Sequence, residues 1–524
     1  MNAPRFDLWR DPWISVQDAQ GQVRPLGLGD ALRKAHTVRA VVEPSPLAIV
    51  GIHRLLVAIL QDALAPQSDA DLVALWWAGC VPEEPLAAFA AQYSARFDLF
   101  SPTAPFLQSA DLGLTPTRDD RVKTVLYLHP DWPAATEVTH YRHGVDTEAA
   151  LCPACAAAGL VAQPAFATSG GAGIRPSING VPPIYVLPQG ETLFHSLVAS
   201  LTTPAYQPTA ADRDEDQAWW RRCPIVGKSA VVERVGYLHS LTFAARQVRL
   251  HPTPSEGQPC SRCGAVGEWL VRTMVYNMGE SRPKDAPWWR DPFVAYRQNA
   301  KGEPVPLRPQ AGRAIWRDYG ALLLAPPPSG SGASTAPGTI PVRVLDQVDA
   351  VTVRLGRLSD EVLHVRCIGL RTDGKAKIFE WIDQGLDVPA SLLHGTQAGF
   401  AVQQGLAFAE EVGRTLRRIW RRHFGGERWE RHASLGQRLI DDYWQALADP
   451  FQHHALLWGE VTDEDAEAAA TAAWARTVIA VAERAFLAAS AQLGDAAATL
   501  RQRIQAETHC RAALITQRKE FFHE

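Results

Sequence analysis

Residues 397–424 read QAGFAVQQGLAFAEEVGRTLRRIWRRHF, and this stretch decides the class of the C-terminal part of the chain. Its apolar residues recur every three or four positions, so they share one side of a helix. They are Val402, Leu406, Ala409, Leu416 and Ile419. Gly425 and Gly426 follow, and glycine commonly ends helices. The stretch therefore predicts one long amphipathic helix.

Three further helical patterns follow this segment. Residues 434–449 have apolar side chains at helical spacing, and Pro450 is expected to end that helix. Residues 462–465 resemble a capping box in front of an alanine-rich helix, which Gly494 ends. The apolar residues expected to face inward in the last helix are Leu500, Ile504 and Leu514. Four helices with short connections predict a four-helix bundle over residues 395–524.

The first 390 residues mix strand-like and helix-like patterns. Ile14 and Val16 alternate with polar residues, as in a strand, and residues 44–64 are apolar on most faces, as in a buried helix. Alternation predicts further strands in residues 230–275, 342–356 and 361–370. Composition predicts loops in residues 103–190 and a surface loop in residues 325–341. The predicted fold class is therefore α+β, with a large mixed α/β domain over residues 1–390 followed by the bundle.

Composition limits the class of protein. The chain has 524 residues, a formal net charge of −4 and 46% hydrophobic residues, which is typical of a folded globular protein. No charge-free apolar run reaches the length of a membrane-spanning helix, and the N-terminus lacks a secretory signal pattern, so we expect a cytoplasmic protein without a membrane partner. The near-neutral charge excludes a histone-like coat but allows a local basic patch.

Two cysteine pairs carry the sharpest chemical signal. Cys152 and Cys155 lie in LCPAC, and Cys260 and Cys263 lie in PCSRCG. Two such pairs can supply four thiolates to one Zn²⁺ in a closed tetrahedral site, which would be structural rather than catalytic. Because 104 residues separate the pairs, two unrelated pairs remain the alternative. The other cysteines are expected to be buried thiols; they are Cys80, Cys223, Cys367 and Cys510.

Two glycine-containing segments could contact nucleic acid. In the first, small residues let backbone amides approach a phosphate or a groove edge; its residues are Ser169, Gly170, Gly171, Ala172, Gly173 and Arg175. In the second, a basic Asp-Gly turn protrudes between a strand pattern and a helix pattern; its tip residues are Gly374, Lys375, Ala376 and Lys377. A plain turn and a solvated hairpin tip are the alternatives.

A basic stretch lies on the first helix of the predicted bundle. Arg414, Arg417, Arg418, Arg421 and Arg422 are spaced three and four apart, so they share a broad face. Like charges at these spacings repel unless a polyanion neutralises them. This arginine face therefore fits nucleic acid or an acidic partner, and a solvated surface is the alternative.

No complete catalytic motif is found. Residues 224–229 end like a phosphate-binding loop, but Arg222 stands where the first glycine is required. Neither an HExxH motif nor a strand followed by GxSxG is present.

Three tryptophan pairs could stack on bases or could anchor a core or an interface; they are Trp76–Trp77, Trp219–Trp220 and Trp288–Trp289.

The order of these features resembles the CasA family, the large subunit of the type I-E CRISPR Cascade surveillance complex. The features are FDLWRDPWISV at the start with a long apolar helix after it, LCPAC, the glycine-rich segment, PCSRCG, Trp-Arg-Asp-Pro at 289–292 and the C-terminal helices. The resemblance covers essentially the whole chain.

The resemblance implies a non-enzymatic subunit that recognises the protospacer-adjacent motif (PAM) in double-stranded target DNA. It also implies that the subunit helps to start R-loop formation and receives a helicase-nuclease, with crRNA and the other Cascade subunits as partners. The resemblance also implies three elements that contact DNA. They are a glycine loop at residues 169–173, a lysine finger at Lys284, with Arg282 as the second choice, and a wedge hairpin at residues 374–376.

The chain departs from the family at this hairpin, where Lys375 stands in place of the usual glutamine. Arg414, Arg418 and Arg421 are expected along displaced DNA or against another subunit. The main alternative is a zinc-containing scaffold subunit of a ribonucleoprotein without direct DNA contact, and a zinc-dependent hydrolase is a third class.

Overall fold

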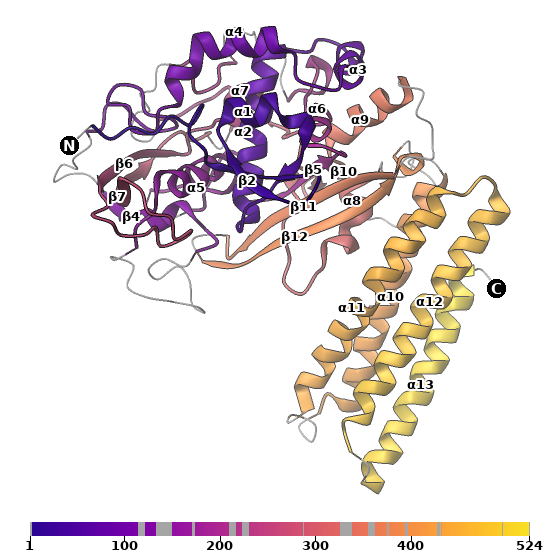
Figure 1. Cartoon of the computed structure of the whole chain (residues 1–524). Coiled ribbons are helices and arrows are strands. Elements are labelled where there is room, and N and C mark those ends of the chain that lie inside the picture. Colours follow the sequence, from indigo (N-terminus) through magenta and orange to yellow (C-terminus); the bar gives the residue numbers. More distant parts are fainter. Residues whose placement is uncertain are drawn as a thin grey trace.

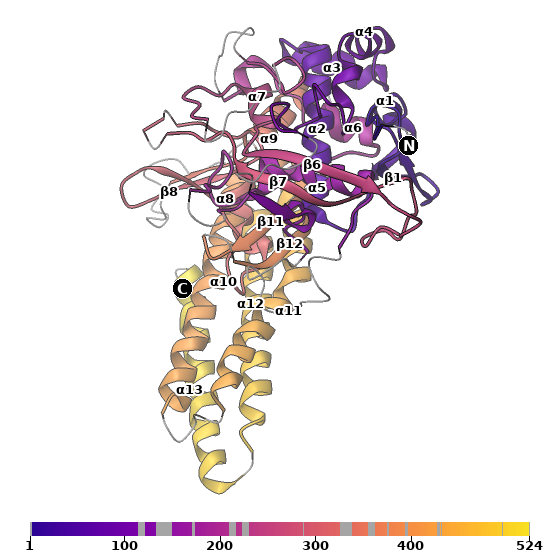
Figure 2. The same ribbon diagram turned by 90° about the vertical axis from the view of Figure 1, so that its left-hand side faces the viewer.

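The computed structural model has a mixed α/β N-terminal part from which the long C-terminal helices project (Figures 1 and 2). It describes residues 3–113, 121–132, 149–169, 173–208, 216–222, 230–283, 285–286, 288–324, 338–354, 362–374, 377–393, 397–426, 430, 432–494 and 496–522. The predicted fold class, mixed α/β followed by a helical bundle, is confirmed.

The described strands form four antiparallel three-stranded sheets. Their orders are β2-β1-β3, β4-β7-β6, β12-β11-β5 and β10-β8-β9. The strands are β1 (Ile14–Asp18), β2 (Val23–Leu26), β3 (Val38–Val41), β4 (Val122–Thr124), β5 (Ile184–Gln189), β6 (Arg246–Pro254), β7 (Trp269–Met278), β8 (Tyr296–Gln298), β9 (Pro304–Pro306), β10 (Thr339–Ile340), β11 (Val362–Thr372) and β12 (Ile378–Pro389).

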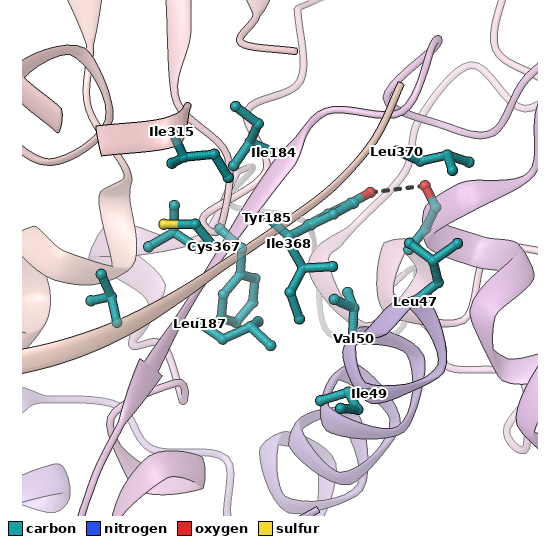
Figure 3. Packing of buried hydrophobic residues seen from close by; sticks show 14 of the residues in the cluster. Leu47, Ile49, Val50, Ile184, Tyr185, Leu187, Ile315, Cys367, Ile368 and Leu370 are labelled. Carbon is teal, nitrogen blue, oxygen red and sulfur yellow. Dashed lines mark hydrogen bonds between the residues drawn. The ribbon is translucent and has the colours of Figure 1, made fainter. Parts of the chain in front are cut away.

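Helix α2 (Pro46–Leu64) forms the centre of the N-terminal part. Every residue from Pro46 to Gln61 is buried, because the helix packs against α5, α4 and the β12-β11-β5 sheet. Figure 3 shows Ile368 of β11 directed toward Val50 of α2, while Cys367 points to the opposite face of the strand. By length and composition α2 is apolar enough to cross a membrane, but 83% of its most apolar window is buried inside the protein. The packing identifies it as a core helix, as the sequence predicted.

Shorter helices cover this core. They are α1 (Leu28–Arg33), α3 (Asp69–Ala78), α4 (Glu83–Tyr93), α5 (Pro153–Phe166), α6 (Leu193–Val198), α7 (Tyr237–Leu241), α8 (Tyr319–Leu323) and α9 (Arg343–Arg354). Helix α5 is the longest regular element within residues 103–190, the stretch that was predicted to be rich in loops. Pro153 stands at its first turn, where the missing amide hydrogen costs nothing.

Helix α9 corrects a second prediction, because residues 342–356 were expected to form a strand. Their Val and Thr content favours strands. However, the buried side chains Val344, Leu345, Val351 and Thr352 recur at helical spacing. Packing of this buried side against α3 favours the helix over the strand. Residues 325–337 of the predicted surface loop lie outside the described residues.

The C-terminal helices are α10 (Gln397–Phe424), α11 (Ala433–Gly459), α12 (Glu464–Ala491) and α13 (Ala497–Phe522). Helix α10 packs against the other three. Asp463 caps α12, since its Oδ1 accepts a hydrogen bond from the amide of Ala466 at 2.8 Å. In α13 the predicted inward face is wrong in part. Leu514 is buried beside Cys510, whereas Leu500 and Ile504 are exposed.

Pro450 does not end its helix, contrary to the sequence prediction. Helix α11 continues through it to Gly459. Phe451 and Trp458, which follow the proline, are fully buried. Phe451 stacks on Trp316 of the N-terminal part with ring centroids 5.0 Å apart. This packing offsets the hydrogen bond that proline removes from a helix.

Candidate metal centre and nucleic-acid interface

The two cysteine pairs are held by different elements. Cys152 directly precedes α5, which places Cys155 on the first turn of the helix. Cys260 and Cys263 lie in the connection between β6 and β7, where Gly264 has a φ of +74° that favours glycine. Two hydrogen bonds join the segments: the amide of Ser261 donates to the Ala150 carbonyl at 2.8 Å, and the amide of Ala150 donates to Ser261 Oγ at 2.9 Å.

These contacts bring four sulfur atoms together. The four Sγ atoms lie within 4.8 Å of one another, and those of Cys152 and Cys263 are 3.6 Å apart although 111 positions separate them. The prediction that the pairs form one cluster is therefore confirmed. Hydrogen bonds to Cys152 and Cys260 raise the pKa of Cys155 far above its ordinary value. Four cysteine sulfurs at this spacing fit a single tetrahedral metal ion, which would bind them as thiolates.

His129 contacts both cysteine-bearing segments and was not found by sequence reasoning. Its Nε2 donates to the Cys155 carbonyl at 2.8 Å, and its Nδ1 accepts from Arg262 Nη1 at 2.9 Å. A carbonyl can only accept and a guanidinium can only donate, so these partners require the neutral tautomer. Burial and the Arg262 charge accordingly lower the pKa of His129 to about 4.

The glycine segment emerges at the end of the β6–β7 ladder. Gly173, with a φ of +80°, and Arg175 are exposed, and Ser169 is half-buried. The amide of Arg175 contacts Sδ of Met278, the last residue of β7, at 3.2 Å. Arg282 follows Met278 by only four positions. The glycine segment and residues 279–283, which directly precede the predicted lysine finger, therefore lie at the same end of this ladder. Arg282 itself is half-buried.

The predicted basic turn is the tip of the hairpin formed by β11 and β12. Gly374 has a φ of +79°, and Lys377 is exposed and donates its amide to Asp373 Oδ1 at 3.1 Å. The expected helix after the turn is strand β12 instead. A Cβ atom on Gly374 would lie 4.0 Å from Val181, and Ile378 lines one pocket with Thr168 and Ile174. The hairpin tip and the ends of the glycine segment are therefore neighbours.

Six candidate residues lie outside the described residues. They are Gly170, Gly171, Ala172, Lys284, Lys375 and Ala376. The described residues that flank them are Ser169 and Gly173, Pro283 and Asp285, and Gly374 and Lys377.

The order of the motifs and their meeting at one edge of the fold invite comparison with known proteins. A family model described as CRISPR-associated protein Cse1 (CRISPR_cse1) matches residues 7–485. This chain belongs to the Cse1 family. It is 31% identical over 431 residues to the CRISPR-associated protein CasA/Cse1 of Thermus thermophilus. The matched region covers 79% of this chain and 77% of that protein.

Solved structures agree with the Cse1 fold. The crystal structure of CasA from Thermus thermophilus matches with a TM-score of 0.76 and 26% identity, over 97% of this chain and 100% of that chain. A chain of a solved CRISPR RNA-guided surveillance complex has the same fold, with a TM-score of 0.74 and 22% identity, over 98% of this chain and 100% of that chain.

The arginine face of this Cse1 family member lies on α10, and all five of its arginines are exposed. Arg414 pairs with Glu411 at 2.6 Å, and Arg418 donates to Thr415 Oγ1 at 3.1 Å. Within the part of the chain that the structure describes, no ion pair involves Arg421. The face therefore keeps a surplus of positive charge.

Other sequence predictions divide between core and surface. Trp219 and Trp220 are core residues, whereas Trp77 and Trp288 are exposed beside more buried partners. Cys367 and Cys510 are buried thiols as predicted. Cys80 is exposed, so that prediction is wrong, and Cys223 lies outside the described residues.

Sequence reasoning missed a buried ion pair that joins helix α2 to the Trp-Arg-Asp-Pro stretch. Asp291 of the Trp-Arg-Asp-Pro stretch pairs with Arg54 of α2. It also accepts a hydrogen bond from Asn179 Nδ2 at 2.9 Å. An arginine within the apolar pattern of α2 was the available signal, since a buried charge requires a partner.

Proposed function

We propose that this chain is the non-catalytic DNA-recognition subunit of a crRNA-guided, type I-E Cascade-like surveillance complex. In this role it recognises the PAM in double-stranded DNA, helps to start R-loop formation and recruits a helicase-nuclease. Membership of the Cse1 family supports the proposal, as does the presence of a similarly folded chain in a solved CRISPR RNA-guided surveillance complex.

The observation that carries the DNA-reading role is the meeting of three candidate contact segments. The Arg175 end of the glycine segment contacts Met278, just before Arg282. Thr168 and Ile174 lie beside Ile378, next to the tip of the β11–β12 hairpin. Reading a short motif and opening the duplex require a groove contact and a wedge at adjacent positions. The guide RNA supplies the remaining sequence specificity by base pairing, so no catalytic group is needed.

We further propose that the four cysteines hold one structural Zn²⁺. Thiolates favour zinc, and a closed set of four leaves no position for a substrate. When bound, the ion would tie the start of α5 to the β6–β7 connection. Both elements also support the glycine segment, because α5 leads into it and β7 ends beside it.

The proposal includes the organisation and setting of the chain. Residues 1–390 would form the DNA-reading domain and residues 395–524 the bundle domain. The arginine face on α10 would lie along displaced DNA or against another Cascade subunit. The chain would act in the cytoplasm together with crRNA and the remaining subunits.

The decisive experiment measures binding of the assembled complex to duplex DNA with and without the PAM over a series of salt concentrations. A DNA-reading subunit predicts motif-dependent affinity that falls steeply with salt. If replacing Gly171, Lys284 and Lys375 together leaves motif-dependent binding unchanged, the chain is a scaffold without direct DNA contact and the proposal fails.

Single variants separate the proposed roles. Gly171→Asp adds bulk and negative charge against DNA and should abolish recognition of every PAM. Lys284→Ala should reduce motif-dependent binding by about 1–3 kcal/mol while leaving assembly intact. Lys375→Ala should impair strand opening more than initial binding, and negative supercoiling should partly restore R-loop formation.

A further inference from the structure

One buried guanidinium spans the two ends of the glycine segment. Arg246, the first residue of β6, is 3% exposed. Its Nη1 donates to the carbonyl of Arg175 at 2.8 Å, and its Nη2 donates to the carbonyl of Thr168. The same Nη1 donates to the Ala245 carbonyl at 2.7 Å. The two carbonyls at the ends of the segment are therefore held by opposite arms of a single side chain.

The base of the segment is closed just outside this contact. The amide of Ser177 donates to the Ala167 carbonyl at 2.9 Å, and Ser177 Oγ donates to the Pro164 carbonyl at 2.5 Å. Ala167, just before the glycine segment, and Ser177, just after it, therefore lie side by side. Within that closed base, Arg246 sets the positions of Thr168 and Arg175.

Arg246 is itself rigidly placed. It pairs in register with Met278 across the β6–β7 ladder, and its guanidinium lies over the ring of Tyr276 at 5.5 Å. Tyr276 is held in turn by a hydrogen bond from its hydroxyl to Gln163 Oε1 of α5 at 2.8 Å. Strand β7, which follows the second cysteine pair, and helix α5, which carries the first, therefore both fix the guanidinium.

The contacts of Arg246 are those of a clamp. Among the described residues, no ion pair involves Arg246, so its charge is met by carbonyl dipoles and the Tyr276 ring. The planar fork presents donors in fixed directions, which a lysine ammonium cannot reproduce. Burial at 3% exposure keeps it from touching a DNA phosphate directly.

We propose that Arg246 is the positioning residue of the glycine segment: it sets the separation and direction of the two ends, and through them the fit of the segment to duplex DNA. This inference rests on the proposed function for its DNA readout. The clamp itself is a property of the described residues and can be tested without DNA.

The test uses Arg246→Lys, which keeps the charge but loses the fork, and Arg246→Met, which loses both. Arg249→Lys is the matched control, because Arg249 lies on the same strand, is 1% exposed and also donates to a backbone carbonyl, that of Ser101 at 3.1 Å. For each chain, thermal unfolding and hydrogen exchange in peptides covering residues 166–178 are measured. The assembled complexes are then titrated with PAM-bearing and PAM-free duplexes.

Arg246→Lys and Arg246→Met should both exchange faster than wild type in residues 166–178, and Arg249→Lys should not. Both Arg246 variants should lose about tenfold in motif-dependent affinity, with the salt slope unchanged because no phosphate contact is removed. Wild-type exchange in both variants would overturn the clamp. Wild-type affinity in Arg246→Lys with a loss in Arg246→Met would assign the effect to charge and overturn it as well. If the wild-type complex ignores the PAM, the proposed function fails and the exchange data alone judge the clamp.

Discussion

Nη1 of Arg54 lies 3.0 Å from Oδ2 of Asp291, and the two side chains are 2% and 0% exposed. The pair joins the central helix to the Trp-Arg-Asp-Pro stretch across 237 positions of sequence. Asp291 Oδ1 also accepts from the amide of Phe293 at 3.0 Å. Removing one partner would leave an uncompensated charge in the core, which is far more costly than removing both.

Asp291→Asn should therefore lower the free energy of unfolding by about 3–5 kcal/mol, and Arg54→Met by a similar amount. The double variant should lose clearly less than the sum of the two. Urea unfolding of the four chains measures this coupling. Asp30→Asn is the control, because the exposed Lys34–Asp30 pair should contribute no more than about 1 kcal/mol. Strictly additive losses would show that Arg54 and Asp291 do not act as a pair.

His53 should make stability depend on pH. Burial, together with the neighbouring Arg54 charge, lowers its pKa to about 3, and its Nε2 lies 2.8 Å from Ser200 Oγ. Between about pH 6.5 and pH 3 the unfolded chain binds a proton that the folded chain does not. Stability is therefore lost as the pH falls through this window.

The variant His53→Gln removes this proton. Between pH 7 and pH 5, the stability of the wild type should fall by about 2 kcal/mol relative to the variant. Unfolding in urea at several pH values measures the difference, which cancels the contributions of other groups. A difference that stays constant with pH would contradict the assignment.

The cysteine cluster predicts a metal content of about one Zn²⁺ per chain. Cys152→Ser and Cys260→Ser should each lower metal content and the unfolding temperature together, by more than about 5 °C. Elemental analysis and thermal unfolding measure the two quantities. Cys80→Ser is the control, because Cys80 is an exposed thiol outside the cluster. A metal-free wild type with the stability of a metal-loaded one would exclude a structural ion.

The arginine face predicts a charge-dependent defect. Reversing Arg414, Arg418 and Arg421 to Glu should weaken target binding at low salt and flatten the salt slope by up to about 3, one for each lost phosphate contact. If the face meets another subunit, assembly should fail instead. The control reverses the exposed Arg476, Arg484 and Arg501, which changes the net charge equally. Equal behaviour of both triple variants would identify the face as a solvated surface.

Local patterns determined much of this protein. The limits of α10 and the burial of α2 follow from the periodicity and length of apolar runs, because a helix face is encoded by residues three and four apart. The residue types at the cysteine pairs and the glycine at position 374 likewise identify chemistry and turn geometry before any fold is known.

Tertiary structure decided what no local pattern holds. Residues 343–354 have strand-forming composition but become a helix because α3 offers a surface for its buried side. Pro450 remains inside α11 because Phe451 packs on Trp316, which gains more than the proline loses. Cys152 meets Cys263, Arg54 meets Asp291 and Arg246 reaches Thr168 and Arg175 only after distant strands and helices have packed. Sequence specifies which groups need partners, and packing of the whole chain determines which partners they find.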